Sequence, residues 1–274
     1  MAPHSEIIGY WGPPTATIDW CEKNYEVNFY VAEMSNTISN LMMILPPIWG
    51  MVEVINQGFE LRFIFCHFLL LVVGLGSWAF HMTLLYEMQL FDELPMVWGT
   101  CVLVYCLAVV KKPENDKMFS NGRLAICLVT FASSFTAVYL LWPQPLLQHS
   151  SYGVLVLISF AQEINLIRLK GCQVCKKLFI ISLTTYLLGF FLWNLDKIFC
   201  SNLHSLRSSM SPYLSPVTQL HGWWHCFAGY ATYLQVFICI HSNYDFKKSK
   251  KEKRKLELCQ MGFGLRWFKP EKSR

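Results

Sequence analysis

Seven long runs of apolar residues limit the folds that are open to this chain. The hydrocarbon core of a bilayer is about 30 Å thick, and a helix needs roughly 20 apolar residues to cross it. Runs close to that length occur at Met34–Val52, Phe63–Leu85, Leu94–Val110, Leu124–Trp142, Tyr152–Ile167, Leu178–Ile198 and Val217–Ile240. Only 15% of the 274 residues are charged, whereas a soluble domain carries about 25%. The pattern predicts an all-α integral membrane protein, a bundle of seven transmembrane helices.

Basic residues are distributed unevenly between the two sides of such a bundle. With seven helices, the N-terminus and the even-numbered connections share one side. That side carries only Lys23, Lys197 and Arg207 of the 23 lysines and arginines. Because basic loop residues favour the cytoplasmic side, we expect a lumenal N-terminus and a cytoplasmic C-terminus.

This topology divides the chain into three regions. Residues 1–33 form a lumenal N-terminal segment, residues 34–241 form the seven-helix membrane domain, and residues 242–274 form a basic cytoplasmic tail. The tail includes the sequence KKSKKEKRK (Lys247–Lys255), which is typical of a juxtamembrane segment attracted to anionic lipid. We expect the lipid bilayer as its partner and no binding to nucleic acid.

Histidines recur at one depth of the predicted bundle. The sequence HGWWH places His221 and His225 on one face of the seventh helix, near its lumenal end. The second helix runs in the opposite direction, so His81 also lies about one turn from the lumenal end, with Ser77 one turn deeper on the same face. Asp92 stands at the lumenal entrance of the third helix. Polar side chains are costly inside a membrane, and their gathering in one layer indicates a functional site.

This set of side chains suits a catalytic zinc ion. Three neutral imidazoles with one open coordination position are a catalytic zinc arrangement. Zinc lowers the pKa of a bound water to about 7 and polarises carbonyl groups. We expect Asp92 to accept the proton and Ser77 to donate a hydrogen bond to the developing oxyanion. His67 lies fourteen residues before His81 on the same helix, about 21 Å away, and cannot join the site.

The cysteine pattern offers one further motif. Most of the eleven cysteines lie in predicted helices, where a free cysteine behaves as a small apolar residue. Cys172 and Cys175 form a CxxC pair in a lysine-rich cytoplasmic loop. A lone pair of this kind is weak evidence for a zinc site or for redox chemistry, and we interpret the two residues as ordinary thiols.

Several longer motifs resemble a known family. The stretches GYWGPPTATIDWCEKNY, VAEMSNTISNL, GSWAFHMTLLYEMQLFDELPM, LLGFFLWNLDKIFC and HGWWH resemble the alkaline ceramidases in their order and spacing. The resemblance extends over essentially the whole chain up to the basic tail. The family is similar in turn to the adiponectin-receptor-like seven-helix hydrolases.

The resemblance implies an activity and a site. It implies that zinc is held by His81, His221 and His225, and that Ser77 and Asp92 complete the catalytic group. The implied reaction is hydrolysis of the ceramide amide to a sphingoid base and a free fatty acid. The implied location is the membrane of the endoplasmic reticulum and Golgi apparatus.

The resemblance also implies a calcium ion in the N-terminal segment. Its ligands would be Asp19, Trp20, Glu22, Asn24 and Glu33. Side-chain oxygens suit calcium, and Trp20 would contribute its backbone carbonyl. Because these residues precede the first helix, we expect calcium to act on structure and not on the chemistry. The alternative is that Asp19 and Glu22 only cap a short helix.

Two cysteines stand apart from the rest. Cys21 and Cys200 flank helices on the predicted lumenal side, where disulfides persist. No third cysteine competes there. We expect a Cys21–Cys200 disulfide that pins the N-terminal segment to the end of the sixth helix.

Three other classes of membrane protein fit the sequence less well. A seven-helix lipid or hormone receptor explains the number of spans, but not three histidines and an aspartate at one depth. Many transporters contain inverted repeats, and no internal repeat occurs here. Di-iron desaturases need more histidines at the cytoplasmic face than this chain offers, since only His67 and His241 lie there.

Overall fold

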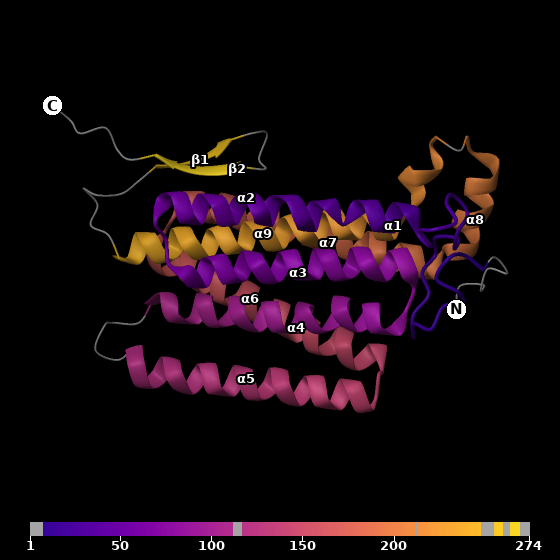
Figure 1. Cartoon of the computed structure of the whole chain (residues 1–274). Helices are drawn as coiled ribbons and strands as arrows, with labels where there is room; N and C mark the ends of the chain where they lie inside the picture. Colours follow the sequence, from indigo (N-terminus) through magenta and orange to yellow (C-terminus); the bar gives the residue numbers. More distant parts are fainter. Residues whose placement is uncertain (1–7, 112–116, 212, 248–254, 260–263, 269–274) are drawn as a thin grey trace.

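The long helices of this protein run side by side along one axis (Figure 1). The computed structural model describes residues 8–111, 117–211, 213–247, 255–259 and 264–268. The long helices are α2 (Leu41–Gln57), α3 (Leu61–Thr83), α4 (Tyr86–Ala108), α5 (Lys117–Leu141), α6 (Pro145–Lys170), α7 (Gln173–Ile198) and α9 (Leu220–Lys247). A short helix, α1 (Met34–Ser39), leads into α2. The bundle agrees with the expected all-α class.

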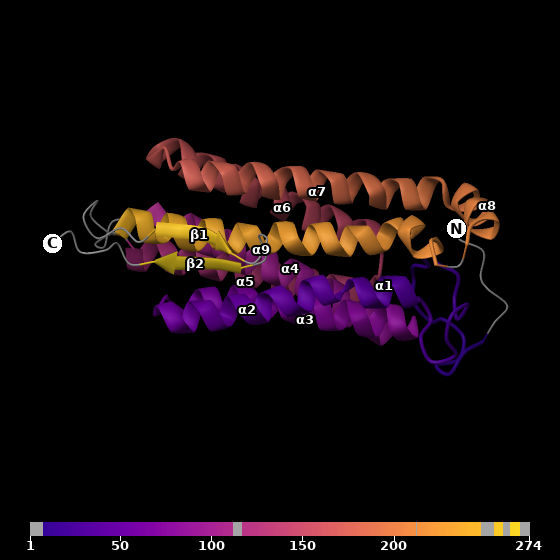
Figure 2. The same ribbon diagram turned by 90° about the horizontal axis from the view of Figure 1, so that it is seen from above.

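Shorter elements join the helices at the ends of the bundle. The 3-10 helix η1 (Val109–Lys111) follows α4, while α8 (Cys200–Ser209) and the 3-10 helix η3 (Ser215–Thr218) connect α7 to α9. The N-terminal segment and α8 gather at one end of the bundle, and the last turns of α9 lie at the other (Figures 1 and 2).

The tail contains a hairpin that the sequence analysis did not predict. Strand β1 (Lys255–Cys259) pairs antiparallel with β2 (Gly264–Phe268), and Leu258 lies opposite Leu265. Most of the basic stretch Lys247–Lys255, which we expect to contact anionic lipid, lies outside the described residues.

Six segments of the described chain are long and apolar enough to cross a membrane. They are the α1–α2 unit, α3, α4, the part of α5 from Asn121 to Leu141, α6 and α7. This protein is therefore a multi-pass membrane protein. The expected seventh span corresponds to α9, which has 28 residues. It is not among these six, and polar residues such as His221, His225 and Gln235 interrupt its apolar sequence.

Helix α9 occupies the middle of the bundle, with α7 on one side and α2 on the other (Figure 2). In its second half, Tyr233, Leu234, Phe237 and Ile238 are all fully buried. They pack against buried residues of α2, α3, α4 and α7. A helix that is surrounded by others needs apolar side chains on every face, and this stretch provides them.

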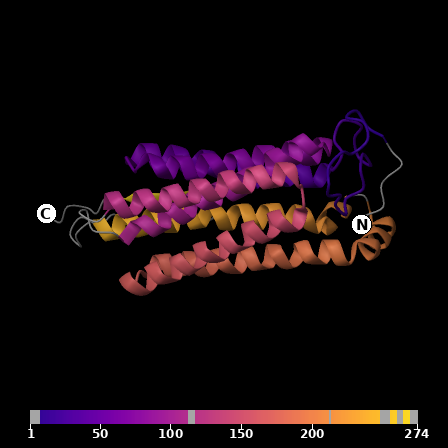
Figure 3. The same ribbon diagram turned by 90° about the horizontal axis from the view of Figure 1, so that it is seen from below.

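Helix α5 lies at the outer edge of the bundle (Figures 1 and 3). Its side chains Ile126 and Val129 are 66% and 65% exposed. Exposed apolar side chains of this kind on a membrane-spanning helix face lipid. The two helices therefore differ in environment although both are rich in apolar residues.

Residues with positive φ end several of the helices. Gly58 after α2 (φ 66°) and Gly171 after α6 (φ 62°) adopt a conformation that glycine tolerates easily. Leu84 follows α3 with φ 53°, which is uncommon for a bulky residue. Its carbonyl oxygen accepts hydrogen bonds from the backbone nitrogens of Thr15 and Ala16, both at 3.1 Å. The N-terminal segment therefore holds the turn between α3 and α4.

The predicted start of the third long helix was wrong. The apolar run begins at Leu94, but α4 begins at Tyr86. Asp92 therefore lies about two turns inside the helix and not at its entrance. The prediction failed because polar residues interrupt the apolar run without interrupting the helix.

Helices α3 and α4 approach each other closely at Gly76. A Cβ atom at this position would lie 2.2 Å from the carbonyl oxygen of Phe91 and 2.9 Å from the backbone nitrogen of Asp92. Only glycine lets the two backbones touch here. Because Ser77 follows Gly76 and Asp92 follows Phe91, this contact brings the two predicted catalytic residues together.

We expect the substitution Gly76→Ala to push α3 and α4 apart. Backbone atoms cannot move aside as a flexible side chain can, so the variant should lose about 1–3 kcal/mol of stability, together with activity. Thermal unfolding of the purified protein in detergent measures the first effect. Gly122→Ala in α5 is the matched control, because the added Cβ meets no described atom within 4 Å beyond its own stretch of helix. An unchanged unfolding temperature for Gly76→Ala would contradict this interpretation.

Candidate active site

Three histidines from two helices meet inside the bundle. His81 comes from the last turn of α3, and His221 and His225 come from the first two turns of α9. One ligand atom from each lies within 4.8 Å of the others, and all three side chains are buried. The structure thus brings together the three residues that we expect to bind zinc.

Hydrogen bonds orient two of the three rings. His81 Nδ1 lies 2.5 Å from Glu33 Oε2, and His225 Nδ1 lies 2.8 Å from Ser39 Oγ. A histidine that binds a metal commonly donates its other ring nitrogen to a neighbouring oxygen, which sets the tautomer. The Nε2 atoms of His81 and His225 are then left for a metal ion.

The third ring, His221, is held by packing. It stacks on Trp20 with ring centroids 3.9 Å apart and planes inclined by 22°. Its Nδ1 atom is buried without a hydrogen-bond partner in the described chain. Behind it, the Asp196 carboxylate faces the backbone amide of His221 and lies 3.7 Å from Arg207. A buried nitrogen without a partner is costly, and a bound metal ion would satisfy it.

Ser77 and Asp92 lie beside the histidines. Ser77 is one turn before His81 on α3, and its hydroxyl interacts with the Asp92 carboxyl group. The neighbouring Glu93 has other partners, because its carboxylate accepts hydrogen bonds from Tyr139 and Gln89. Of the two neighbouring acids, Asp92 is therefore the one that faces Ser77.

One cavity connects these residues with the apolar interior of the bundle. It has a volume of about 430 Å³. The polar residues along it include Ser77, His81, Asp92, His221 and His225. Most of the remaining wall is formed by apolar side chains of α3, α4, α6, α7 and α9. Apolar walls with a few convergent polar groups are typical of a ligand-binding site.

Comparison with known proteins identifies the class of enzyme. A family model described as Ceramidase matches residues 12–262. The chain belongs to the ceramidase family. It is 42% identical over 247 residues to Alkaline ceramidase 3 of Mus musculus, covering 88% of this chain and 89% of the relative. It is 32% identical over 253 residues to Alkaline ceramidase YPC1 of Saccharomyces cerevisiae, covering 87% and 80%. The expected family is thereby confirmed, and the protein is an enzyme of the amide hydrolase class.

The N-terminal segment of this ceramidase turns several polar groups inward. Glu22, Asn24 and Glu33 are buried, and Asn24 Oδ1 and Glu33 Oε1 lack a hydrogen-bond partner among the described residues. Asp19 and the backbone of Trp20 both interact with the Glu33 carboxyl group. Calcium prefers oxygen ligands of this kind, so the donor set fits the calcium ion that the resemblance implies.

Glu22 also caps helix α1. Its Oε1 atom accepts a hydrogen bond from the Ser35 backbone nitrogen at 2.7 Å, and its Oε2 atom accepts one from the Asn36 nitrogen at 2.8 Å. The alternative interpretation, in which Glu22 is a helix cap, is therefore correct in part. Capping and calcium binding are compatible because each carboxylate oxygen has two lone pairs. Burial, together with the neighbouring Glu33, raises the pKa of Glu22 to about 7.

Glu33 belongs to both groups of residues. Its backbone nitrogen donates to the His81 carbonyl oxygen at 2.9 Å, and its side chain accepts from the Asn36 amide at 3.1 Å in addition to contacting the His81 ring. Burial raises the pKa of Glu33 well above its usual range. A cation beside it would favour the ionised form.

Ser39, and the contact of Glu33 with His81, were not predicted from the sequence. One signal was present, because Asn36, Ser39 and Asn40 are polar residues inside an otherwise apolar run. Residues three or four apart share a helix face, and this pattern indicated a polar partner for α1. It did not indicate which residue that partner is.

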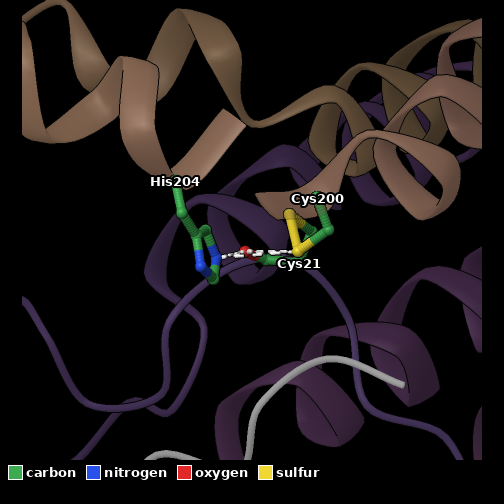
Figure 4. Close-up of side chains that lie close together, drawn as sticks. All are labelled: Cys21, Cys200 and His204. Atoms are coloured by element: carbon green, nitrogen blue, oxygen red, sulfur yellow. Dashed lines mark hydrogen bonds between the residues drawn. A yellow bond between two sulfur atoms is a disulfide. The ribbon is translucent and has the colours of Figure 1, made fainter. Parts of the chain in front are cut away.

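Cys21 and Cys200 form the expected disulfide, with Cα atoms 5.4 Å apart (Figure 4). His204 Nε2 lies 2.7 Å from the Cys21 carbonyl oxygen, and Arg207 donates to the same oxygen at 2.8 Å. The two cysteines and His204 lie as close together as metal ligands do, but the disulfide uses both sulfur atoms. The bridge pins the N-terminal segment to the junction of α7 and α8.

If calcium binds to this donor set, its binding should weaken as the pH falls through about 7. Below that value the buried Glu22 carboxyl holds a proton, and calcium must then compete with the proton. Without calcium, the folded protein holds this proton more tightly than the unfolded chain, whose carboxyl has the ordinary pKa of 4.5. The stability of the calcium-free protein should therefore fall as the pH rises from 4.5 to about 7.

The measurement is the rise in unfolding temperature on adding calcium, recorded one pH unit above and one pH unit below the Glu22 pKa of about 7. The rise should be larger at the higher pH. Glu22→Gln should bind calcium more weakly and lose most of the pH dependence, because its amide does not titrate. An equal rise at both pH values for the unchanged protein would show that Glu22 takes no part in calcium binding.

Proposed function

We propose that this protein is a zinc-dependent intramembrane ceramidase, which hydrolyses ceramide to a sphingoid base and a free fatty acid. The main support is the buried three-histidine cluster beside Ser77 and Asp92, in a cavity with largely apolar walls. Relatives along most of the chain are named alkaline ceramidases. An apolar cavity inside a membrane bundle suits a substrate with two long hydrocarbon chains. Dihydroceramide and phytoceramide carry the same amide and are expected substrates.

The histidine cluster fits zinc on the chemistry of its donors. Zn²⁺ takes three neutral imidazoles and keeps one position open. Glu33 and Ser39 supply the outer hydrogen bonds that such ligands commonly make. Zinc bound there would polarise the substrate carbonyl and lower the pKa of a water molecule.

Asp92 and Ser77 would handle the proton and the developing charge. Asp92 takes a proton from the attacking water and passes it to the amide nitrogen as the C–N bond breaks. The water oxygen becomes part of the fatty acid, and the sphingoid base leaves as an amine. Once Asp92 is protonated, the Ser77 hydroxyl no longer has an ionised carboxylate to which it donates its hydrogen bond. It can then donate its hydrogen bond to the oxyanion.

The proposed topology has seven crossings, with α9 as the seventh. At 28 residues, α9 exceeds the length that a span requires. The N-terminal segment and the end of α9 lie at opposite ends of the bundle (Figure 1), as an odd number of crossings demands. The Cys21–Cys200 disulfide favours the oxidising side for the N-terminal end. We therefore place that end in the lumen of the endoplasmic reticulum and Golgi apparatus, and the tail in the cytoplasm.

Ceramide would reach the site from the bilayer, between α6 and α7. Leu157 of α6 and Leu187 of α7 line the cavity, yet they are 70% and 56% exposed. Side chains that face both the cavity and the outside of the bundle lie at its opening. This opening is on the lipid-facing side, so the substrate need not leave the membrane.

Calcium would act on structure in this proposal. A calcium ion on the N-terminal segment would hold Glu33 in position against His81, since the two residues are already joined by backbone and side chain. It would not contact the substrate, because the oxygens that fit it belong to the segment before α1.

Substitutions should separate the roles of these residues. His81→Ala, His221→Ala or His225→Ala should lose activity together with the zinc ion that the three histidines hold. Asp92→Asn should keep zinc but lose turnover, because an amide cannot carry the proton. Ser77→Ala should keep zinc and lose about 10²–10³-fold in rate, the scale for removing one oxyanion donor. Metal analysis and ceramide hydrolysis on the same purified samples measure both properties.

His67→Ala is the control for these variants. His67 is also a buried histidine of α3, but its ring packs against Tyr233 and Phe237. The variant should keep zinc and near-normal turnover per folded molecule. The mechanism is wrong if zinc content does not follow the three cluster histidines, or if Asp92→Asn hydrolyses ceramide normally.

The access route makes a separate prediction. Leu157→Trp should narrow the opening and slow the hydrolysis of long-chain ceramides more than that of short-chain ones, with zinc content unchanged. Val129→Trp places the same side chain on the outer face of α5, where Val129 is 65% exposed, and should have little effect. Equal rates for all chain lengths in Leu157→Trp would exclude this route.

A further inference from the structure

A second group of metal-binding side chains lies at the opposite end of the bundle from the active site. It consists of Cys172, Cys175 and His241, which have ligand atoms within 4.8 Å of one another. Cys172 precedes α7, Cys175 lies in its first turn, and His241 lies near the end of α9. The sequence alone showed only a CxxC pair, because 66 residues separate Cys175 from His241.

The histidine is directed at both sulfur atoms. His241 Nδ1 lies 3.2 Å from Cys175 Sγ and 3.6 Å from Cys172 Sγ. Cys175 and His241 are buried, and Cys172 is half-buried. The three ligand atoms are close enough to one another to bind one common cation.

The local backbone favours thiolate over thiol. Cys172 is the N-cap residue of α7, and its sulfur accepts a hydrogen bond from the Cys175 backbone nitrogen at 3.2 Å. A helix N-terminus stabilises a negative charge, and cysteines in this position ionise more readily. Asp245 lies one turn after His241, and its negative charge acts on Cys175. That charge disfavours a second thiolate at Cys175 unless a cation is bound nearby.

We propose that Cys172, Cys175 and His241 bind a second zinc ion, which clamps the start of α7 to the end of α9. Two thiolates and a neutral imidazole are ligands that zinc prefers, and two thiolates balance its charge. A water molecule completes the tetrahedral set. The role is structural, since the site lies away from the cavity that holds the catalytic residues.

The main rival is a redox-active Cys172–Cys175 disulfide. In the structure both cysteines are free, whereas Cys21 and Cys200 at the other end are bonded. Disulfides form on the oxidising side of a membrane, so the end with the CxxC pair is on the reducing side. Reduced thiols beside a histidine favour metal binding.

Metal analysis of the purified full-length protein tests the proposal. Cys172→Ala, Cys175→Ala and His241→Ala should each contain one zinc ion per chain fewer than the unchanged protein, with the zinc at the active-site histidines retained. Cys239→Ala is the matched control, because Cys239 lies two residues from His241 on the same helix and is free. It should keep the full zinc content. Equal zinc in the cluster variants and the control would overturn the proposal.

Cobalt substitution distinguishes this site from the proposed active site. Cobalt(II) bound by thiolates gives an intense charge-transfer absorption in the near ultraviolet, and cobalt bound by three imidazoles does not. The band should appear in the cobalt-loaded protein, persist in His81→Ala and disappear in Cys175→Ala. Absence of the band in the cobalt-loaded protein would overturn the second site whatever the outcome at the first.

Thiol chemistry on the unchanged protein avoids the risk that a variant fails to fold. Zinc should protect the half-buried Cys172 from alkylation, and a strong chelator should remove the protection. Mass spectrometry that found a Cys172–Cys175 disulfide in protein purified without reductant would establish the redox alternative instead.

Discussion

The paired contact between Glu33 and His81 is the interaction on which the rest of the site depends. A backbone hydrogen bond and a side-chain hydrogen bond join the two residues. The N-terminal segment is thereby attached to the last turn of α3, and its neighbour Ala32 adds a second backbone bond to Met82 at 2.9 Å. The same carboxyl group lies among the acids that fit calcium. A displacement of Glu33 would therefore change the orientation of His81, a proposed zinc ligand.

Burial makes this arrangement of charged and polar groups costly in free energy. Charged and polar groups in the interior of a membrane bundle lose the hydration that would stabilise them. Here Glu33, three imidazoles and Asp92 are all buried. Bound cations would reduce the electrostatic repulsion between the buried carboxylates and would give the ring nitrogens a cation to bind. The proposed second zinc ion would likewise compensate buried ligand atoms at the other end of α9, where two sulfurs and an imidazole meet. Helix α9 would then be tied to its neighbours by a metal at each end.

Much of the fold could be predicted because apolar runs of membrane length have few alternatives to a helix. The long helices all appear where such runs occur, and the three histidines that the family motifs single out lie close together in the structure. Errors arose where polar residues lie inside helices. The early start of α4 was missed because residues 86–93 are more polar than the rest of that helix. The break at Asn40 between α1 and α2, and the short helix α8, were likewise missed because neither produces a long apolar run.

The sequence by itself determined the membrane class, the helical periods and the pairing of His221 with His225, since residues four apart on a helix must share a face. Only the tertiary structure decided that Glu33 binds His81, that Ser39 binds His225, and that His241 lies between Cys172 and Cys175. These contacts join elements far apart in the chain, and their distances depend on how closely the helices pack. That closeness is set by local features such as the Gly76 contact between α3 and α4, whose effect appears only when the two helices meet.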